Sequence, residues 1–110
     1  MSLPLEGLKV LAFEQYGAGP FGSQYLSDLG AEVIKIEPAG TDGDYLRALG
    51  PYFIDEERNS ASSIFFQALN RNKKSITLNI LSSEGKEILG KLVKTSDAAV
   101  SYTHLTLPTI

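Results

Sequence analysis

The sequence predicts an α/β fold, a Rossmann-like parallel sheet with flanking helices. Residues 8–37 carry the first observation: an apolar run (8–13), a glycine-rich turn, a helical pattern and a β-branched run (33–36) follow one another. A second strand–helix–strand pattern follows over residues 75–100. Two strands joined by a helix are expected to pair in parallel with a right-handed connection.

The helix of the first unit carries an apolar stripe. Phe21, Tyr25, Leu26 and Leu29 recur at helical spacing. Pro20 fits the first helical position, with Gly19 as the cap before it. Gly30 is expected to end this helix.

The other expected elements follow from capping and periodicity. Residues 38–63 are expected to be a long loop rich in glycine and proline, with one helical turn near Tyr45 to Leu49. A short helix over 63–69, a strand over 75–80, a helix over 83–94 and a strand opening at 98–100 complete the prediction. Ser82 is a good N-cap for the third helix. Its buried stripe is predicted to be Ile88, Leu89, Leu92 and Val93, and the strand before it is predicted to turn Ile76, Leu78 and Ile80 to one face.

Gly17, Gly19 and Gly22 match the dinucleotide-binding pattern G-x-G-x-x-G. Glu37 ends the second strand 20 residues after Gly17, where an acid that binds ribose is expected. However, residues 14–16 separate the strand from the first glycine, and Pro20 offers no N–H to a pyrophosphate. A dinucleotide-binding domain therefore stays as an alternative hypothesis.

Composition limits the classes of function. The chain has 110 residues, enough for one small domain, a net charge of −3 and no cysteine. Disulfides and cysteine-ligated metals are thereby excluded, and the charge gives no general attraction to nucleic acid or anionic membranes. The sequence contains no stretch of about 20 apolar residues and no secretory signal pattern. We therefore expect a cytoplasmic protein.

Five segments appear in an order that resembles the class III CoA-transferase family, which includes formyl-CoA transferase, carnitine CoA-transferases and alpha-methylacyl-CoA racemase. They are PLEGLKVL, GAGPFGSQYLSDLGAEVIKIEP, GDYLR, NRNKKSITLNI and SEGKEIL. The resemblance runs from about Leu3 to Val100. It implies coenzyme A as the acyl carrier, no metal, and CoA thioesters and small carboxylic acids as partners.

The resemblance also implies which residues contact CoA. Gln15, Tyr16, Gly17 and Ala18 match a turn that lies against CoA in the family, and Leu78, Asn79 and Leu81 match a stretch beside its adenine and ribose. Some family members carry an arginine at the position of Pro38. Four other cations are candidates for the positive charge that a CoA 3′-phosphate requires: Arg47, Arg71, Lys73 and Lys74.

No catalytic or metal-binding residue is expected within the chain. Family transferases use a nucleophilic aspartate and racemase members use a His/Asp pair, and both are implied to lie beyond the region of resemblance. The single histidine, His104, has no metal-ligand spacing around it.

The resemblance implies an incomplete protein, because family members are several times longer. We expect residues 1–100 to be the N-terminal part of a CoA-transferase large domain, and residues 101–110 to be a non-native or aberrant tail. The intact enzyme is expected to be an interlocked homodimer. The chain alone is expected to bind CoA weakly or not at all and to be inactive, and a truncated product without function remains a further alternative.

Overall fold

Four parallel strands form the sheet of the computed structural model, which describes residues 2–55 and 63–101. The strands are β1 (Lys9–Phe13), β2 (Glu32–Pro38), β3 (Lys74–Leu78) and β4 (Ala98–Ser101). Their order is β3-β2-β1-β4, and every neighbouring pair is parallel. The predicted α/β class is confirmed.

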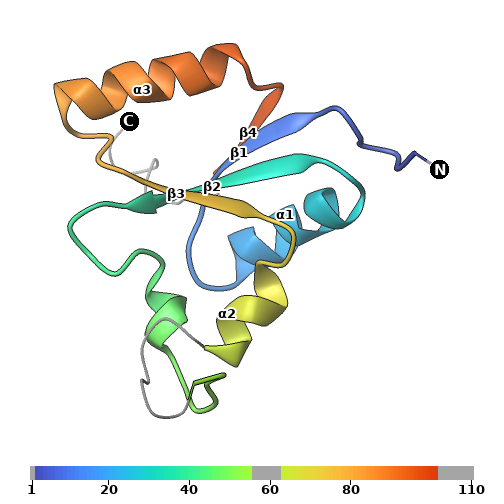
Figure 1. Cartoon of the computed structure of the whole chain (residues 1–110), viewed down its shortest axis with the longest axis vertical. Helices are drawn as coiled ribbons and strands as arrows, with labels where there is room; N and C mark the ends of the chain where they lie inside the picture. Colours follow the sequence, from blue (N-terminus) through green and yellow to red (C-terminus); the bar gives the residue numbers. More distant parts are fainter. Residues whose placement is uncertain (1, 56–62, 102–110) are drawn as a thin grey trace.

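Helices lie on both sides of this sheet. The described helices are α1 (Ala18–Asp28), α2 (Ile64–Leu69), α3 (Ser83–Lys94) and a 3-10 helix η1 (Tyr45–Ala48). Figure 1 shows α1 and α2 on one side of the strands and α3 on the other. The strand order explains this: the chain moves from β1 to β2 to β3 in one direction and returns to the far side of β1 for β4. Right-handed connections in opposite directions place their helices on opposite faces.

The core lies between the sheet and α1. Val10, Ala12, Ala31 and Val33 form its buried cluster. The predicted helix α1 exists, but only Leu26 of its apolar stripe is half-buried and packs on this cluster, whereas Phe21, Tyr25 and Leu29 are exposed. It buries its small and polar residues, which are Gly19, Pro20, Ser23, Gln24 and Ser27. Small residues allow helix and strands to approach closely, and the three polar ones bond to neighbouring groups of the protein.

Two boundaries differ from the sequence prediction. Helix α1 begins at Ala18, with Gly17 at the N-cap, so Pro20 lies inside the first turn, where the missing N–H costs no helical hydrogen bond. Strand β3 ends at Leu78, because the Asn79 side chain turns the backbone by accepting a hydrogen bond from the Leu81 amide at 3.1 Å. Ile80 therefore lies outside the strand and is 38% exposed.

Helix α3 has the predicted bounds and the predicted cap, since Ser82 Oγ accepts a hydrogen bond from the Gly85 amide at 2.9 Å. Its stripe is only partly covered: Leu89 and Leu92 are half-buried, whereas Ile88 and Val93 are exposed. The predicted helical turn near Tyr45 and the helix after Ser63 are also present.

The described residues include the first residue, Ser101, of the segment 101–110 that was predicted to be non-native. Ser101 is the last residue of β4 and lies opposite Phe13 of β1. Residues 102–110, with His104, lie outside the described residues. The origin of this segment stays a prediction.

Candidate functional site at the carboxyl edge of the sheet

The turn after β1 lies where the direction of the strand order reverses. The chain passes from β1 to β2 on one side, and β4 pairs with β1 on the other side. In open α/β sheets, ligands bind in the crevice outside the carboxyl ends of the two strands at such a point. Gln15, Tyr16 and Ala18 are exposed there and Gly17 is half-buried. The structure therefore brings the first predicted contact segment to a position suited to a ligand.

The second predicted contact segment lies at the same edge of the sheet. Leu78 ends β3 and is half-buried, whereas Asn79 is exposed and Leu81 is 84% exposed. Strand β2 separates β3 from β1, so the ends of these two strands lie about 10 Å apart. One extended ligand of the size of a nucleotide could contact both segments.

A cluster of four buried charges lies beneath the turn. We define this buried ion cluster as Glu14, Lys35, Asp44 and Lys73. Lys35 Nζ lies 2.8 Å from Asp44 Oδ2, and Lys73 Nζ lies 2.9 Å from Glu14 Oε1. All four side chains are at most 2% exposed. Two cations balance two carboxylates, which is what allows such charges to be buried.

Neutral groups add hydrogen bonds to this cluster, although the buried Oε2 of Glu14 accepts none. Asn70 Oδ1 accepts from Lys35 at 3.0 Å and from Lys73 at 3.2 Å. Ser23 Oγ donates to Glu14 at 2.7 Å. Burial lowers the pKa of Lys73, and the Glu14 carboxylate offsets this only in part. The cluster joins the end of β1, the start of α1, β2 and the segment after α2, so it holds the turn against the sheet.

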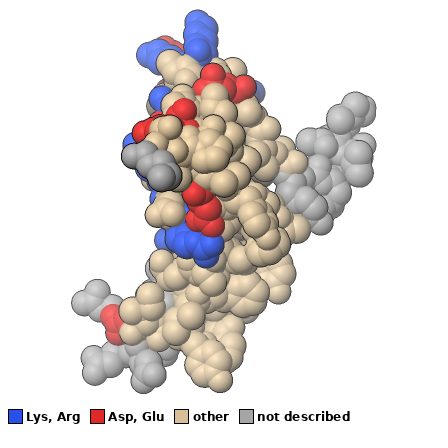
Figure 2. Space-filling view, turned by 90° about the vertical axis from the view of Figure 1, so that its right-hand side faces the viewer, with Lys and Arg blue, Asp and Glu red and all other residues tan. Residues whose placement is uncertain are grey.

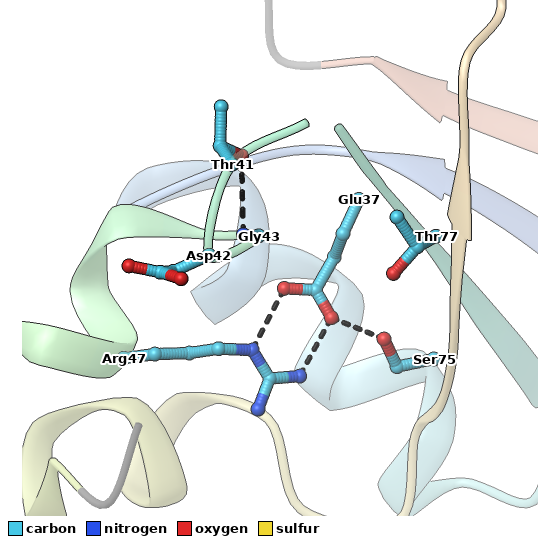
Figure 3. A pocket seen from close by; sticks show the side chains of 7 residues that line it. All are labelled: Glu37, Thr41, Asp42, Gly43, Arg47, Ser75 and Thr77. Atoms are coloured by element: carbon cyan, nitrogen blue, oxygen red, sulfur yellow. Dashed lines mark hydrogen bonds and ion pairs between the residues drawn. The ribbon is translucent and has the colours of Figure 1, made fainter. Parts of the chain in front are cut away.

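A further ion pair, between Arg47 and Glu37, lies beside a shallow pocket of about 340 Å³. Arg47 donates to both carboxylate oxygens of Glu37, at 2.8 and 2.6 Å, and Ser75 Oγ also donates to this carboxylate, as Figure 3 shows. The Asp44 amide donates to Glu37 Oε1 at 2.7 Å. Burial raises the pKa of Glu37, but these donors outweigh it and bring the pKa down to about 2.

These contacts argue against the dinucleotide alternative. Glu37 is the acid that would bind a ribose, yet it is 3% exposed and both of its oxygens accept hydrogen bonds within the protein. The left-handed backbone of the turn falls at Tyr16, with φ of 69°, whereas the first glycine of the motif, Gly17, has φ of −117°. The glycine pattern therefore matches the letters of the motif without its conformation.

The structure pairs all four predicted phosphate-binding cations with carboxylates. Arg47 pairs with Glu37, and Lys73 is buried against Glu14. Arg71 and Lys74 pair with Asp28 and Glu32, each at 2.6 Å. Because Lys74 opens β3 and Asp28 ends α1, these two pairs lie at the amino edge of the sheet, opposite the turn. An anion at the carboxyl edge would need other donors.

An aromatic group lies beside the turn. The Tyr16 ring stacks on Tyr45 of η1, with centroids 5.4 Å apart, and on Phe65 of α2 at 6.1 Å. All three side chains are between 43% and 57% exposed. Tyr52 and Ile54 are exposed in the same part of the chain, and Figure 2 shows a mostly uncharged surface over the lower part of the molecule, where these elements lie.

Sequence reasoning missed the roles of Glu14, Lys35 and Asp44. Lys35 offered a signal, because it stands in an apolar strand at a position that alternation with Val33 turns towards the core. Such a lysine requires a buried acid. The acid that pairs with Lys35 is Asp44, in the loop after β2. Local sequence patterns do not determine the path of this loop.

Among the described residues, no cluster of acidic or histidine side chains is arranged to hold a metal ion. In that same part of the chain, no helix is long and apolar enough to cross a membrane.

Comparison with known proteins identifies the family. The model of CoA-transferase family III matches residues 5–104, so the chain belongs to this family. Over 97 residues it is 44% identical to "Succinyl-CoA:glutarate CoA-transferase" of Homo sapiens, covering 88% of the chain and 21% of the relative. Over 104 residues it is 41% identical to "Formyl-CoA:oxalate CoA-transferase" of Escherichia coli O139:H28, covering 94% and 24%.

A solved structure shows the same fold. A CAIB/BAIF family protein from Brucella suis superposes with a TM-score of 0.83 at 42% identity, covering 96% of this chain and 27% of that protein. The chain thus spans about a quarter of the length of the proteins that it matches. The predicted family resemblance is confirmed.

Proposed function

We propose that this chain forms part of the CoA site of an enzyme that moves CoA between carboxylic acids. The observation that carries the proposal is the position of the turn 15–18: it is exposed, at the reversal point of a parallel sheet, in a chain of CoA-transferase family III. The CoA contacts would be Gln15, Tyr16, Gly17 and Ala18, with Leu78, Asn79 and Leu81 on the adenosine side.

The residues present fit part of such a ligand. Backbone N–H groups at the start of α1 face the same edge, where the helix dipole favours an anionic group. Leu78 and Leu81 supply apolar surface for a purine ring. Because the nearby cations are paired, we propose that further groups for the phosphates lie outside the described residues.

The proposed reaction proceeds through covalent intermediates on an aspartate. Its carboxylate attacks the thioester carbonyl and releases the CoA thiolate, which leaves a mixed anhydride. The thiolate then attacks the aspartyl carbonyl, frees the first acid and leaves a CoA thioester on the enzyme. In the second half, the carboxylate of the incoming acid attacks the aspartyl thioester and releases the CoA thiolate, which leaves a new mixed anhydride. The thiolate then attacks the acyl carbonyl of the incoming acid, which forms the new CoA thioester and frees the aspartate. We propose that this aspartate lies beyond the present chain, whose own role is to bind and orient CoA.

Two further features of the whole enzyme are proposed with it. The whole enzyme would be a homodimer, and its acids would be small carboxylic acids like those in the names of the relatives. An acyl-CoA racemase of the same family would use the same CoA contacts, so it is the alternative reaction.

Titration of the ¹⁵N-labelled chain with CoA tests the proposal. We expect weak binding, with amide shifts confined to residues 15–18 and 78–81. NADH serves as the matched control, because a dinucleotide site would instead shift Gly17, Gly19, Gly22 and Glu37. Shifts with CoA that avoid both predicted segments, or no shifts at high CoA concentration, would contradict the proposal.

A further inference from the structure

Tyr16 adopts a backbone conformation that its side chain does not favour. Its φ is 69°, in the left-handed region, where a residue with a bulky side chain is uncommon. Such conformations persist only when the surrounding structure holds them. Tyr16 stands in the middle of the proposed CoA-binding turn, so what holds its backbone also sets the shape of that turn.

Asp44, 28 residues further along the chain, supplies this hold. Its Oδ1 accepts hydrogen bonds from the Tyr16 amide at 3.2 Å and from the Leu46 amide at 3.0 Å. Its Oδ2 lies 2.8 Å from Lys35 Nζ, and the residue is fully buried. One carboxylate therefore ties the turn to η1 and to β2.

The fixed position of Asp44 makes this hold effective. Its own amide donates to Glu37 at 2.7 Å, and Glu37 is in turn held by Arg47. The ring of Tyr45, the next residue, stacks on the ring of Tyr16. The turn and η1 thus meet through both backbone and side chain.

We propose that Asp44 is a positioning residue of the CoA site, acting through the hydrogen bond that it accepts from the Tyr16 amide. It holds residue 16 in the left-handed conformation and so fixes the surface that residues 15–18 present. This inference rests on the proposed function, because it assigns the turn to CoA.

Substitutions at residue 16 test the hold without CoA. The variants Tyr16→Gly and Tyr16→Ala both lack the ring. The difference between their stabilities therefore reports the backbone conformation that residue 16 has to adopt. We expect the folded-to-unfolded ratio in urea to be at least about two-fold higher for glycine, because alanine is strained at positive φ. With residue 16 at negative φ, alanine would be the more stable of the two, and that result would overturn the proposal.

Substitutions at Asp44 test the cause of the hold. Asp44→Ala removes the acceptor, whereas Asp44→Asn keeps one acceptor oxygen for the Tyr16 amide but loses the charge and replaces the other oxygen with an NH2 group. The preference for glycine at residue 16 should vanish with Asp44→Ala and persist with Asp44→Asn. If Asp44→Ala fails to fold, Asp44→Asn still decides. Loss of the preference for glycine at residue 16 in Asp44→Asn would show that the hydrogen bond from the Tyr16 amide does not hold the turn.

CoA titration then connects the hold to binding. In Asp44→Ala we expect the Kd for CoA to rise at least about five-fold, with the shifts at residues 15–18 lost and those at 78–81 retained, because the binding conformation becomes a minor state. Asp42→Ala, an exposed acid in the same loop, is the control and should leave the Kd unchanged. Absence of turn shifts in the unmodified chain would refute the proposed function; normal shifts in Asp44→Ala would refute only the role of Asp44.

Discussion

Gly85 shows how tightly one residue can be constrained in this fold. A Cβ at this position would overlap the carbonyl oxygen of Asn79, in the turn that ends β3. Gly90, in the same helix, has no atom within 4 Å of such a Cβ. Position 90 therefore has room for a side chain and position 85 has none, although both lie in α3.

We expect Gly85→Ala to destabilise the chain by at least about 2 kcal/mol, because the clash is with backbone that has to move. Gly90→Ala should stabilise it by about 0.5–1 kcal/mol, the ordinary preference of a helix for alanine. Urea unfolding of both variants measures the difference. Equal stability of the two would show that the turn at Asn79 does not lie against α3.

The buried ion cluster makes Lys35 the second sensitive residue. Lys35→Met keeps the apolar stem but leaves the fully buried Asp44 without its closest cation. We expect a loss of about 3–5 kcal/mol in the free energy of unfolding. Lys74→Met, which breaks an exposed pair with Glu32, is the control and should cost at most about 1 kcal/mol. Similar losses in both variants would mean that Lys35 is not buried among charges.

At the scale of elements, α1 presents both of its aromatic side chains to the outside. Phe21 and Tyr25 are 53% and 57% exposed and pack edge to face on each other. On α2, by contrast, Phe66 is 6% exposed, with the guanidinium carbon of Arg47 4.1 Å from the centre of its ring.

Phe21→Ala should therefore cost about 1 kcal/mol or less, because only an exposed aromatic contact is lost. Phe66→Ala should cost about 3–5 kcal/mol, because it removes a buried ring. Thermal or urea unfolding compares the same substitution on two helices. A large loss from Phe21→Ala would mean that the apolar stripe of α1 faces the core.

The Glu37–Arg47 pair joins β2, η1 and β3, so it makes the arrangement of these elements depend on pH. The pKa of Glu37 is about 2 in the folded chain and near the ordinary glutamate value of 4.5 when unfolded. A depressed carboxyl pKa adds stability above the unfolded value, and this stability is lost as the pH falls from about 4.5 towards 2. Unfolding free energies across that range should fall less steeply in Glu37→Gln than in the unmodified chain. Parallel pH profiles would contradict the assignment.

At the scale of the whole molecule, the proposal assigns the CoA-binding turn to this chain and the nucleophilic aspartate to another part of the enzyme. We expect no CoA transfer from succinyl-CoA to glutarate or from formyl-CoA to oxalate, measured by separation of the CoA thioesters. Calorimetric titration should show no submicromolar affinity for CoA. The human relative, assayed with succinyl-CoA and glutarate, is the positive control. Turnover by this chain would place a reactive group within it.

Much of the fold could be predicted because its signals are local. The bounds of α3 followed from the Ser82 cap and the helical period, and the parallel sheet followed from alternating strands and helices. The end of β3 was missed by two residues, since a side-chain turn at Asn79 outweighed the apolar alternation. The start of α1 was also missed by two residues, because Gly17 and not Gly19 is the N-cap and Pro20 lies inside the first turn. The CoA-contact residues were named from the family resemblance, and they stay a prediction.

The sequence by itself determined the class of fold, the order of its elements and the family. These depend on periodicity, caps and ordered motifs, which act between neighbours along the chain. Only the tertiary structure decided which face of α1 is buried, that Glu37 is held by Arg47, and that Asp44 reaches the Tyr16 amide. These contacts join residues up to 47 positions apart, and which residues become partners depends on how the helices and loops pack on the sheet.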